Sequence, residues 1–149
     1  MSSLEETLRS DLLDATRSRD VVRRDTLRMV ISSIGNARIQ SGQELSDDEV
    51  VKVLQKEAKQ RRESIDEFQK GNRDDLVQKE KAELAIIELF LPLQLSEEEI
   101  KSFAEQAITN VNAGSLSDLG QVMRELMPML EGRADGKVAN QIVRELLNS

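Results

Sequence analysis

The residues best suited to bind a ligand lie in a short segment near the C-terminus, residues 132–137, that reads Gly-Arg-Ala-Asp-Gly-Lys. Gly132 can adopt the left-handed conformation that ends a helix, and Asp135 can accept a hydrogen bond from the first backbone N–H groups of the next helix. Arg133 and Lys137 flank that helix N-terminus, where free N–H groups and the helix dipole favour an anion. The segment therefore predicts either a corner that contacts an anionic group or an ordinary helix–turn–helix connection with solvated charges.

The residue types that the chain lacks limit the chemistry it could perform. It contains no His, Cys, Tyr or Trp, so imidazole bases, thiolate nucleophiles and the usual zinc ligands are absent. No serine is followed by lysine three positions later, and no Gly-x-Ser-x-Gly motif is present. The segment 132–137 also differs from a P-loop, because it is one residue shorter and is followed by Val138 instead of a magnesium-binding Ser or Thr. We expect no catalytic residues, no metal site, no cofactor and no self-contained enzyme.

The charge distribution argues against a chain that binds nucleic acid over its whole surface. The formal net charge is −7, with 33% charged and 38% hydrophobic residues. Residues 1–95 carry 16 Lys/Arg and 19 Asp/Glu, and residues 96–149 carry 5 and 9, so any anion site must be local. The N-terminus does not resemble a signal peptide, and no stretch approaches the about 20 apolar residues of a membrane span. We expect a cytoplasmic protein with no membrane partner and no bound DNA.

Apolar residues recur at helical spacing along nearly the whole chain, and no segment alternates with the period of a strand. Capping-box patterns mark three helix starts, at residues 3–6, 46–49 and 96–99. The predicted helices begin at about residue 3, cover about 20–40, 47–70 and 74–91, begin again at about 97 and 115, and end with a last helix after residue 137. Pro128 is expected to kink or end the sixth helix. The pattern predicts an all-α fold.

Pro92 and the renewed cap at Ser96 mark the predicted domain boundary. We expect an N-terminal bundle of about four helices, residues 1–94, followed by a smaller three-helix domain, residues 95–149. Just before the boundary, residues 84–91 are apolar on nearly every side. Such a helix end indicates either an interface with the second domain or a partner, or burial inside the N-terminal bundle.

Other charged groups have both a functional and a structural interpretation. Arg17, Arg24 and Arg28 could share one face and contact a phosphate backbone, but interleaved aspartates favour a salt-bridged surface. The same choice applies to a secondary basic face on the third helix. Its members are Lys52, Lys56, Lys59 and Arg62, with Arg61 nearby. The carboxylates at 47–49 and 97–99 lie in first helical turns, where the helix dipole explains them.

Three motifs in this order resemble those of the YqeY family. Residues 55–64, Gln-Lys-Glu-Ala-Lys-Gln-Arg-Arg-Glu-Ser, are similar to its N-terminal signature, and residues 91–95, Leu-Pro-Leu-Gln-Leu, to its domain junction. Residues 126–128, Leu-Met-Pro, followed by residues 132–137 and Asn140, look like its C-terminal signature. The resemblance covers essentially the whole chain. This GatB/YqeY group shares its C-terminal helical domain with the tail of the GatB component of the tRNA-dependent Asp/Glu amidotransferase.

The resemblance implies an all-helical, two-part protein with a tail-like domain that contacts tRNA, because the tail is the part of the amidotransferase that does so. By analogy, the RNA-facing corner comprises Gly132, Arg133, Asp135, Gly136, Lys137 and Asn140, with Arg124 as a second cation. The family label of carbon–nitrogen ligase activity with glutamine as amido-N-donor looks inherited from that enzyme, since no residue here supports it. The partners implied are tRNA or other RNA and translation or amidotransferase proteins.

Two positions depart from the family pattern. Relatives commonly carry Lys where this chain has Gln121, and Lys again in the stretch occupied by residues 129–131, which ends in Glu131. Each missing cation removes a phosphate contact. The resulting hypothesis is a non-catalytic accessory protein with an RNA-contacting helical tail. The alternative is a helical protein–protein interaction module that binds no RNA and uses residues 84–91 as its interface.

Overall fold

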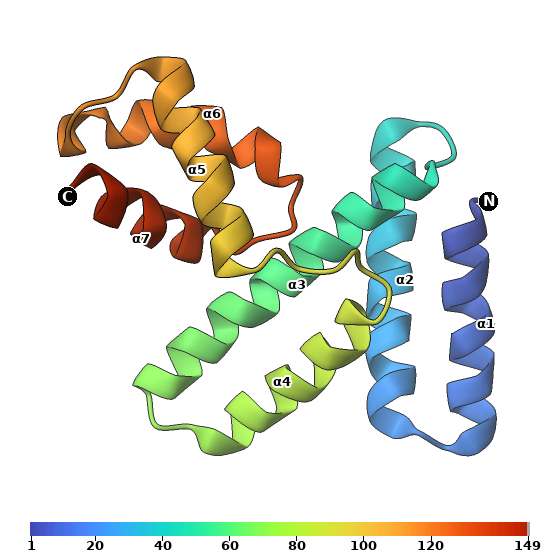
Figure 1. The fold of residues 1–149 in the computed structure, drawn as a ribbon. Coiled ribbons are helices and arrows are strands. Elements are labelled where there is room, and N and C mark those ends of the chain that lie inside the picture. The colour runs from blue at the N-terminus through green and yellow to red at the C-terminus, as the bar shows by residue number, and fades with distance from the viewer. Residues whose placement is uncertain (149) are drawn as a thin grey trace. The chain divides into compact units, whose positions relative to one another are not determined.

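The computed structural model describes residues 1–148, and every regular element in that range is helical (Figure 1). The helices are α1 (Ser3–Ser18), α2 (Val21–Ser41), α3 (Asp47–Lys70), α4 (Asp74–Glu88), α5 (Glu97–Val111), a 3-10 turn η1 (Leu116–Asp118), α6 (Leu119–Leu130) and α7 (Gly136–Leu147). The predicted all-α fold, with four helices followed by three, is confirmed.

The chain divides into two compact units, Met1–Leu91 and a second that begins at Pro92. Each has an apolar core of its own, formed almost wholly by aliphatic side chains. The buried core of the first unit comprises Leu8, Ala15, Leu27, Val30, Ile34, Leu45, Val50, Leu54, Ala58 and Ile87. That of the second comprises Leu95, Ile100, Ala104, Ala107, Val122, Leu126, Leu130, Ala139 and Val143. The assignment of residues 1–94 and 95–149 to two named domains stays a prediction.

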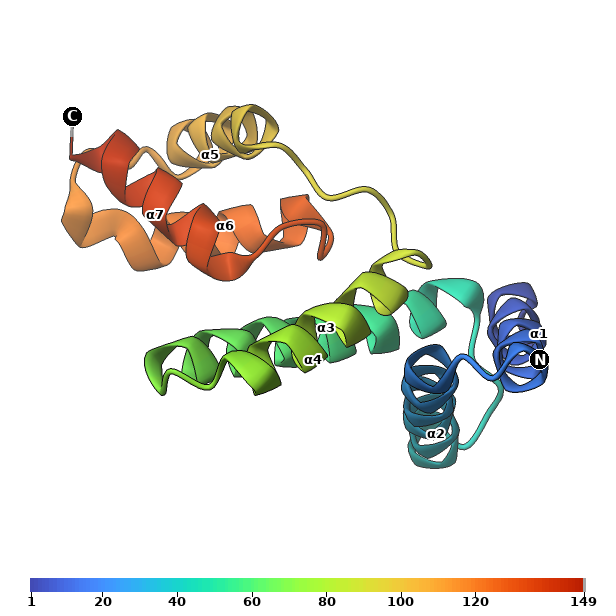
Figure 2. The same ribbon diagram turned by 90° about the horizontal axis from the view of Figure 1, so that it is seen from below.

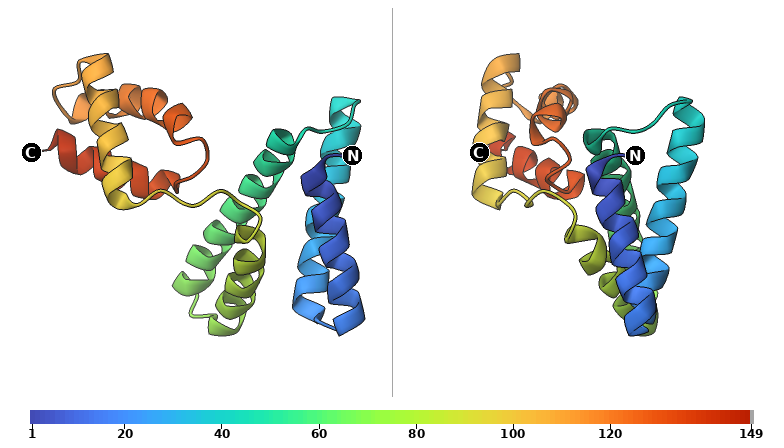
Figure 3. Two further views of the ribbon diagram at one scale, coloured as in Figure 1. Left: turned by 45° about the vertical axis from the view of Figure 1, so that its right-hand side comes forward. Right: turned by 90° about the vertical axis from the view of Figure 1, so that its right-hand side faces the viewer.

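The first unit consists of two helical hairpins. Helices α1 and α2 pack side by side, and so do α3 and α4 (Figures 2 and 3). The hairpins are joined where α3 begins: Asp47 accepts hydrogen bonds from the Leu4 backbone N–H at 3.0 Å and from the Ser3 hydroxyl at 2.7 Å. The carboxylate thus caps α1 from another helix.

The predicted capping box at Ser3 is wrong by one residue. The N-cap of α1 is Ser2, whose hydroxyl accepts a hydrogen bond from the Glu5 N–H at 3.1 Å. Ser3 is the first helical residue because Asp47 takes its hydroxyl instead. The boxes predicted at Ser46 and Ser96 are both present.

Helix α4 ends at Glu88, three residues before the predicted end at 91. Ile87 is fully buried, and the partly buried side chains of Leu84, Ile86, Phe90 and Leu91 pack on the core of the first unit. Leu89, by contrast, is 78% exposed. Most of the apolar segment 84–91 is therefore core of its own unit, which favours the second of the two interpretations made from the sequence.

The second unit packs α5 against α6 and α7. Helix α6 contains Pro128 and continues to Leu130, so it does not end at the proline. Proline removes only one hydrogen bond, close to the C-terminus, where few intrahelical bonds remain to be made. The turn that follows leads directly into α7.

Candidate functional site

The corner between α6 and α7 is built by two left-handed residues and one capping side chain. Glu131 has φ 49° and Gly132 has φ 71°, and together they reverse the chain at the end of α6. Asp135 is the N-cap of α7, and its Oδ1 accepts a hydrogen bond from the Lys137 backbone N–H at 2.9 Å. The conformation of Gly132 and the cap at Asp135 agree with the sequence-based expectation.

Arg133 ties this corner to the segment that precedes α5. Its Nε donates a hydrogen bond to the Leu93 backbone carbonyl at 2.9 Å, and the Leu95 backbone N–H donates to the Arg133 carbonyl at 2.8 Å. Nearby, hydrogen bonds from Ser96 lower the pKa of Glu99, and the Arg133 charge adds to this effect. Arg133 therefore has a structural role that spacing alone does not reveal.

One face of α7 carries a row of polar side chains, which we call the α7 polar stripe: Lys137, Asn140 and Arg144. Residues three and seven positions apart share a helix face. Lys137 and Arg144 are exposed, Asn140 is half-buried, and the Arg144 Nε donates to the Asn140 Oδ1 at 2.7 Å. Arg144 is absent from the sequence-based site, although its spacing from Lys137 was visible in the sequence.

The two remaining members of the predicted corner are Arg124, on α6, and Gly136, the first residue of α7. Arg124 is exposed on α6, as is Gln121 one turn earlier. Met127, one turn later, approaches the corner, since its methyl lies 3.7 Å from where a Cβ on Gly136 would be. Arg124 and Met127 therefore lie on consecutive turns of α6, and Met127 lies beside the first residue of α7.

Comparison with known proteins identifies the family. A family model described as Yqey-like protein matches residues 5–147. The chain belongs to the YqeY-like family. The resemblance in residues 55–64, 91–95 and 126–140 is thereby confirmed at the level of the family.

Several fungal relatives of this YqeY-like chain carry the name "Altered inheritance of mitochondria protein 41, mitochondrial". The one from Pyrenophora tritici-repentis is 30% identical over 146 residues, which cover 95% of this chain and 80% of that protein. The one from Clavispora lusitaniae is 32% identical over 128 residues, which cover 83% of this chain and 74% of that protein. The one from Kluyveromyces lactis is 38% identical over 108 residues, which cover 70% of this chain and 58% of that protein.

The YqeY-type motif at residues 55–64 builds a buried ion-pair network. Arg61 is 7% exposed and donates from Nη1 to the Glu57 Oε2 at 2.6 Å, while its Nε lies 3.5 Å from the Glu83 carboxylate. The Ser33 hydroxyl donates to the other Glu57 oxygen at 2.7 Å. Because these partners come from α2, α3 and α4, the network links the three helices.

The predicted secondary basic face lies on the outer side of the same helix. Lys52, Lys56 and Lys59 are exposed on α3. Arg62 is half-buried, and its Nη2 lies 3.4 Å from a carboxylate oxygen of Glu88. The face thus offers three exposed cations and a fourth that is engaged with α4.

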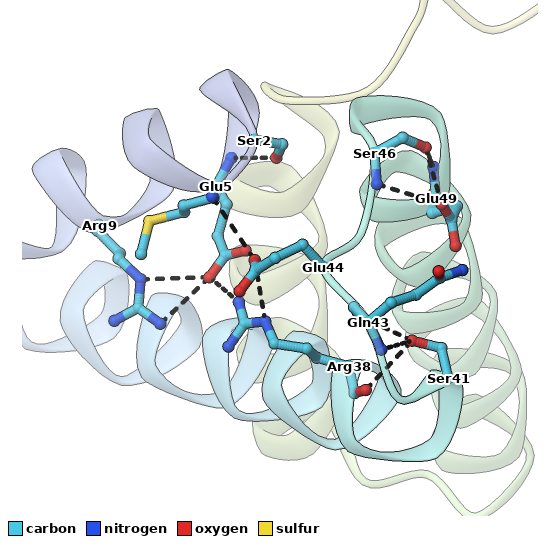
Figure 4. Close-up of polar contacts among 10 residues, drawn as sticks. Ser2, Glu5, Arg9, Arg38, Ser41, Gln43, Glu44, Ser46 and Glu49 are labelled. Carbon is cyan, nitrogen blue, oxygen red and sulfur yellow. Dashed lines mark hydrogen bonds and ion pairs between the residues drawn. The ribbon is translucent and has the colours of Figure 1, made fainter.

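A second buried carboxylate joins α1 to α2 (Figure 4). Glu5 is fully buried, and its Oε2 accepts hydrogen bonds from Arg38 and, at 3.2 Å, from the Arg9 Nη2. Burial acts to raise the pKa of Glu5, but the hydrogen bonds and charges of Arg38 and Arg9 outweigh it and hold the pKa below its usual value. Sequence reasoning missed this ion pair and the Arg61 network.

Two further findings concern residues 1–148. No group of three or more acidic side chains among them is arranged to hold a metal ion. No helix within that range is long and apolar enough to cross a membrane.

Proposed function

We propose that this YqeY-like chain is a non-catalytic accessory protein whose second unit contacts the backbone of tRNA or another RNA. The observation that supports this best is the α7 polar stripe. Its two cations, Lys137 and Arg144, are seven residues apart, or about 10 Å along the helix, so they can contact different phosphates of one strand. Because the Asn140 oxygen already accepts from Arg144, its NH₂ group is the part that can donate to a nucleotide.

The rest of the corner assists this contact. Arg133 uses Nε to hold Leu93, while its two terminal nitrogens carry further N–H donors that can face a phosphate. Arg124 supplies an exposed cation from α6. Since residues 96–149 carry more acidic than basic residues, we expect modest affinity that depends on these few cations.

Location and partners belong to the same proposal. The sequence favours a cytoplasmic protein, whereas the three fungal relatives have "mitochondrial" in their names. Partners from the translation or amidotransferase machinery follow from the family resemblance alone. Fractionation of cells that produce the tagged chain decides between the two locations.

The test is a titration of fluorescently labelled tRNA with the purified chain at several salt concentrations. The variant Lys137→Glu with Arg144→Glu should weaken binding more than tenfold and lower the salt slope by about 2. The matched control is Lys79→Glu with Lys81→Glu on α4, two exposed lysines outside both predicted basic sites, which should bind like the original chain. Absence of binding at low salt, or equal losses in both double variants, contradicts the proposal.

The alternative function is a protein–protein interaction module that binds no RNA. One observation favours it: Leu89, at the end of α4, is 78% exposed despite its apolar side chain. Under this alternative, Leu89→Asp abolishes capture of a partner in a pull-down while the variant stays folded. The matched control is Ile39→Asp, a residue of α2 that is 79% exposed and should leave capture unchanged.

A further inference from the structure

A groove in the second unit lies between the first turns of α5 and the C-terminal half of α7. Its volume is about 400 Å³. The lining residues are Glu97, Glu98, Lys101, Ile142, Glu145 and Leu146. Ile142 and Leu146 are half-buried aliphatic residues one turn apart, so they supply an apolar floor, and the charged residues form the rim.

The groove and the α7 polar stripe occupy different sides of the same helix. Arg144 and Leu146 are two residues apart, and successive residues of a helix are rotated by about 100°, so their side chains leave α7 in nearly opposite directions. A ligand in the groove therefore does not compete for the stripe.

The rim is acidic, and one of its carboxylates is placed where helix electrostatics disfavour it. Glu97 and Glu98 lie in the first turn of α5, where the helix dipole favours negative charge. Glu145 lies in the last turn of α7, where the dipole favours a cation instead. Its Oε1 accepts a hydrogen bond from the neutral Gln141 side chain at 3.1 Å, which offsets little of that cost. A cationic ligand would compensate this carboxylate.

We propose that the groove docks a basic amphipathic segment of a partner protein. An aliphatic or aromatic side chain of that segment packs over Ile142 and Leu146, and Lys or Arg side chains on either side of it contact Glu97, Glu98 and Glu145. The pairing follows from charge complementarity, since three carboxylates and a single ammonium surround an apolar floor. The same rim repels an RNA backbone or an anionic lipid surface, so neither is the occupant.

The test uses the full chain and a fluorescently labelled synthetic peptide that places leucines on one helical face and lysines on the other. The peptide should bind at low salt and more weakly as salt increases. Glu145→Lys should weaken binding about tenfold, because an attraction becomes a repulsion. The charge-matched control is Glu125→Lys, on α6 and outside the groove lining, which should bind the peptide as the original chain does. Circular dichroism checks that both variants are folded.

Two further peptides test the chemistry of the occupant. A leucine–glutamate peptide should not bind, and a lysine–serine peptide should bind much more weakly because it leaves the apolar floor exposed. The proposal is overturned if the leucine–lysine peptide does not bind, or if the Glu145 and Glu125 variants lose affinity equally. It is also overturned if the lysine–serine peptide binds as well as the leucine–lysine peptide.

Discussion

The Nε of Arg133 donates a hydrogen bond to the backbone carbonyl of Leu93 at 2.9 Å. The two residues lie on either side of the α5–α6 segment: Leu93 precedes α5 and Arg133 follows α6. A second hydrogen bond, from the Leu95 backbone N–H to the Arg133 carbonyl at 2.8 Å, joins the same two segments. Arg133, one of the residues of the predicted RNA-facing corner, therefore also anchors the start of its own unit.

Because Arg133 donates a hydrogen bond to Leu93, truncation of the Arg133 side chain should lower the stability of the protein. Arg133→Ala should lower the free energy of unfolding by about 1 kcal/mol, because the hydrogen bond is lost from a partly exposed site. Urea denaturation measures the change. The control Arg124→Ala, which removes an exposed arginine from α6, should change stability by less than about 0.5 kcal/mol. Equal changes in both variants would show that Arg133 has no anchoring role.

The cap of α7 predicts a different pattern of substitutions. Asp135→Ala should cost about 1 kcal/mol, because the Lys137 N–H loses its acceptor. Asp135→Asn should restore most of that stability, since asparagine caps helices about as well as aspartate. Thermal unfolding of the two variants provides the comparison. An asparagine variant as unstable as the alanine variant would contradict the capping assignment.

Acid should weaken the first unit, because two of its carboxylates, Glu5 and Asp47, have lowered pKa values in the folded state. The pKa of Glu5 lies below 4.5, its ordinary value, although burial opposes the shift, and the Leu4 N–H and the Ser3 hydroxyl lower the pKa of Asp47. A group of this kind stabilises the fold above its unfolded pKa and loses that contribution as the pH falls through the folded pKa. Stability should therefore decline as the pH falls below about 4.5.

Substitution of Glu5 tests how much of this decline comes from one group. Glu5→Gln should cost about 2 kcal/mol at pH 7, because Arg38 and Arg9 lose a charged hydrogen-bond acceptor, and should make the dependence on pH shallower in the acid range. Urea denaturation at pH 7 and in acid gives both quantities. The control is Glu6→Gln at the exposed neighbouring residue, which should change neither the free energy of unfolding at pH 7 nor its dependence on pH. A Glu5 variant with the original acid sensitivity would contradict this account.

The position of Glu145 predicts that its removal stabilises the protein. Glu145→Lys places a cation in the last turn of α7 and should raise the free energy of unfolding by about 0.5 kcal/mol. The control Glu105→Lys, in the middle of α5, should have little effect. Thermal unfolding measures both. A destabilised Glu145 variant would mean that the carboxylate supports the fold rather than a ligand.

The features that the sequence predicted well are those set by neighbouring residues. The capping boxes at Ser46 and Ser96 formed because each needs only residues three positions apart. The box expected at Ser3 failed because its hydroxyl bonds Asp47, 44 positions away. Local patterns carry no information about such a partner.

The buried charges show the same limit. Glu5 and Arg61 stand in charged helices and look like surface residues in the sequence, but helix pairing buries both. Arg133 finds a backbone carbonyl 40 residues away, which no side-chain pattern predicts. Arg144 is different, because its spacing from Lys137 was visible and only its contact with Asn140 was needed to place it in the site.

The most direct test of RNA contact by the second unit is the slope of tRNA affinity against salt concentration, measured for the original chain and for Lys137→Glu with Arg144→Glu. If α7 contacts RNA, the original chain should bind in a salt-dependent way, and the slope should be shallower by about 2 in the double variant. Identical affinities and slopes for the two proteins would contradict this contact.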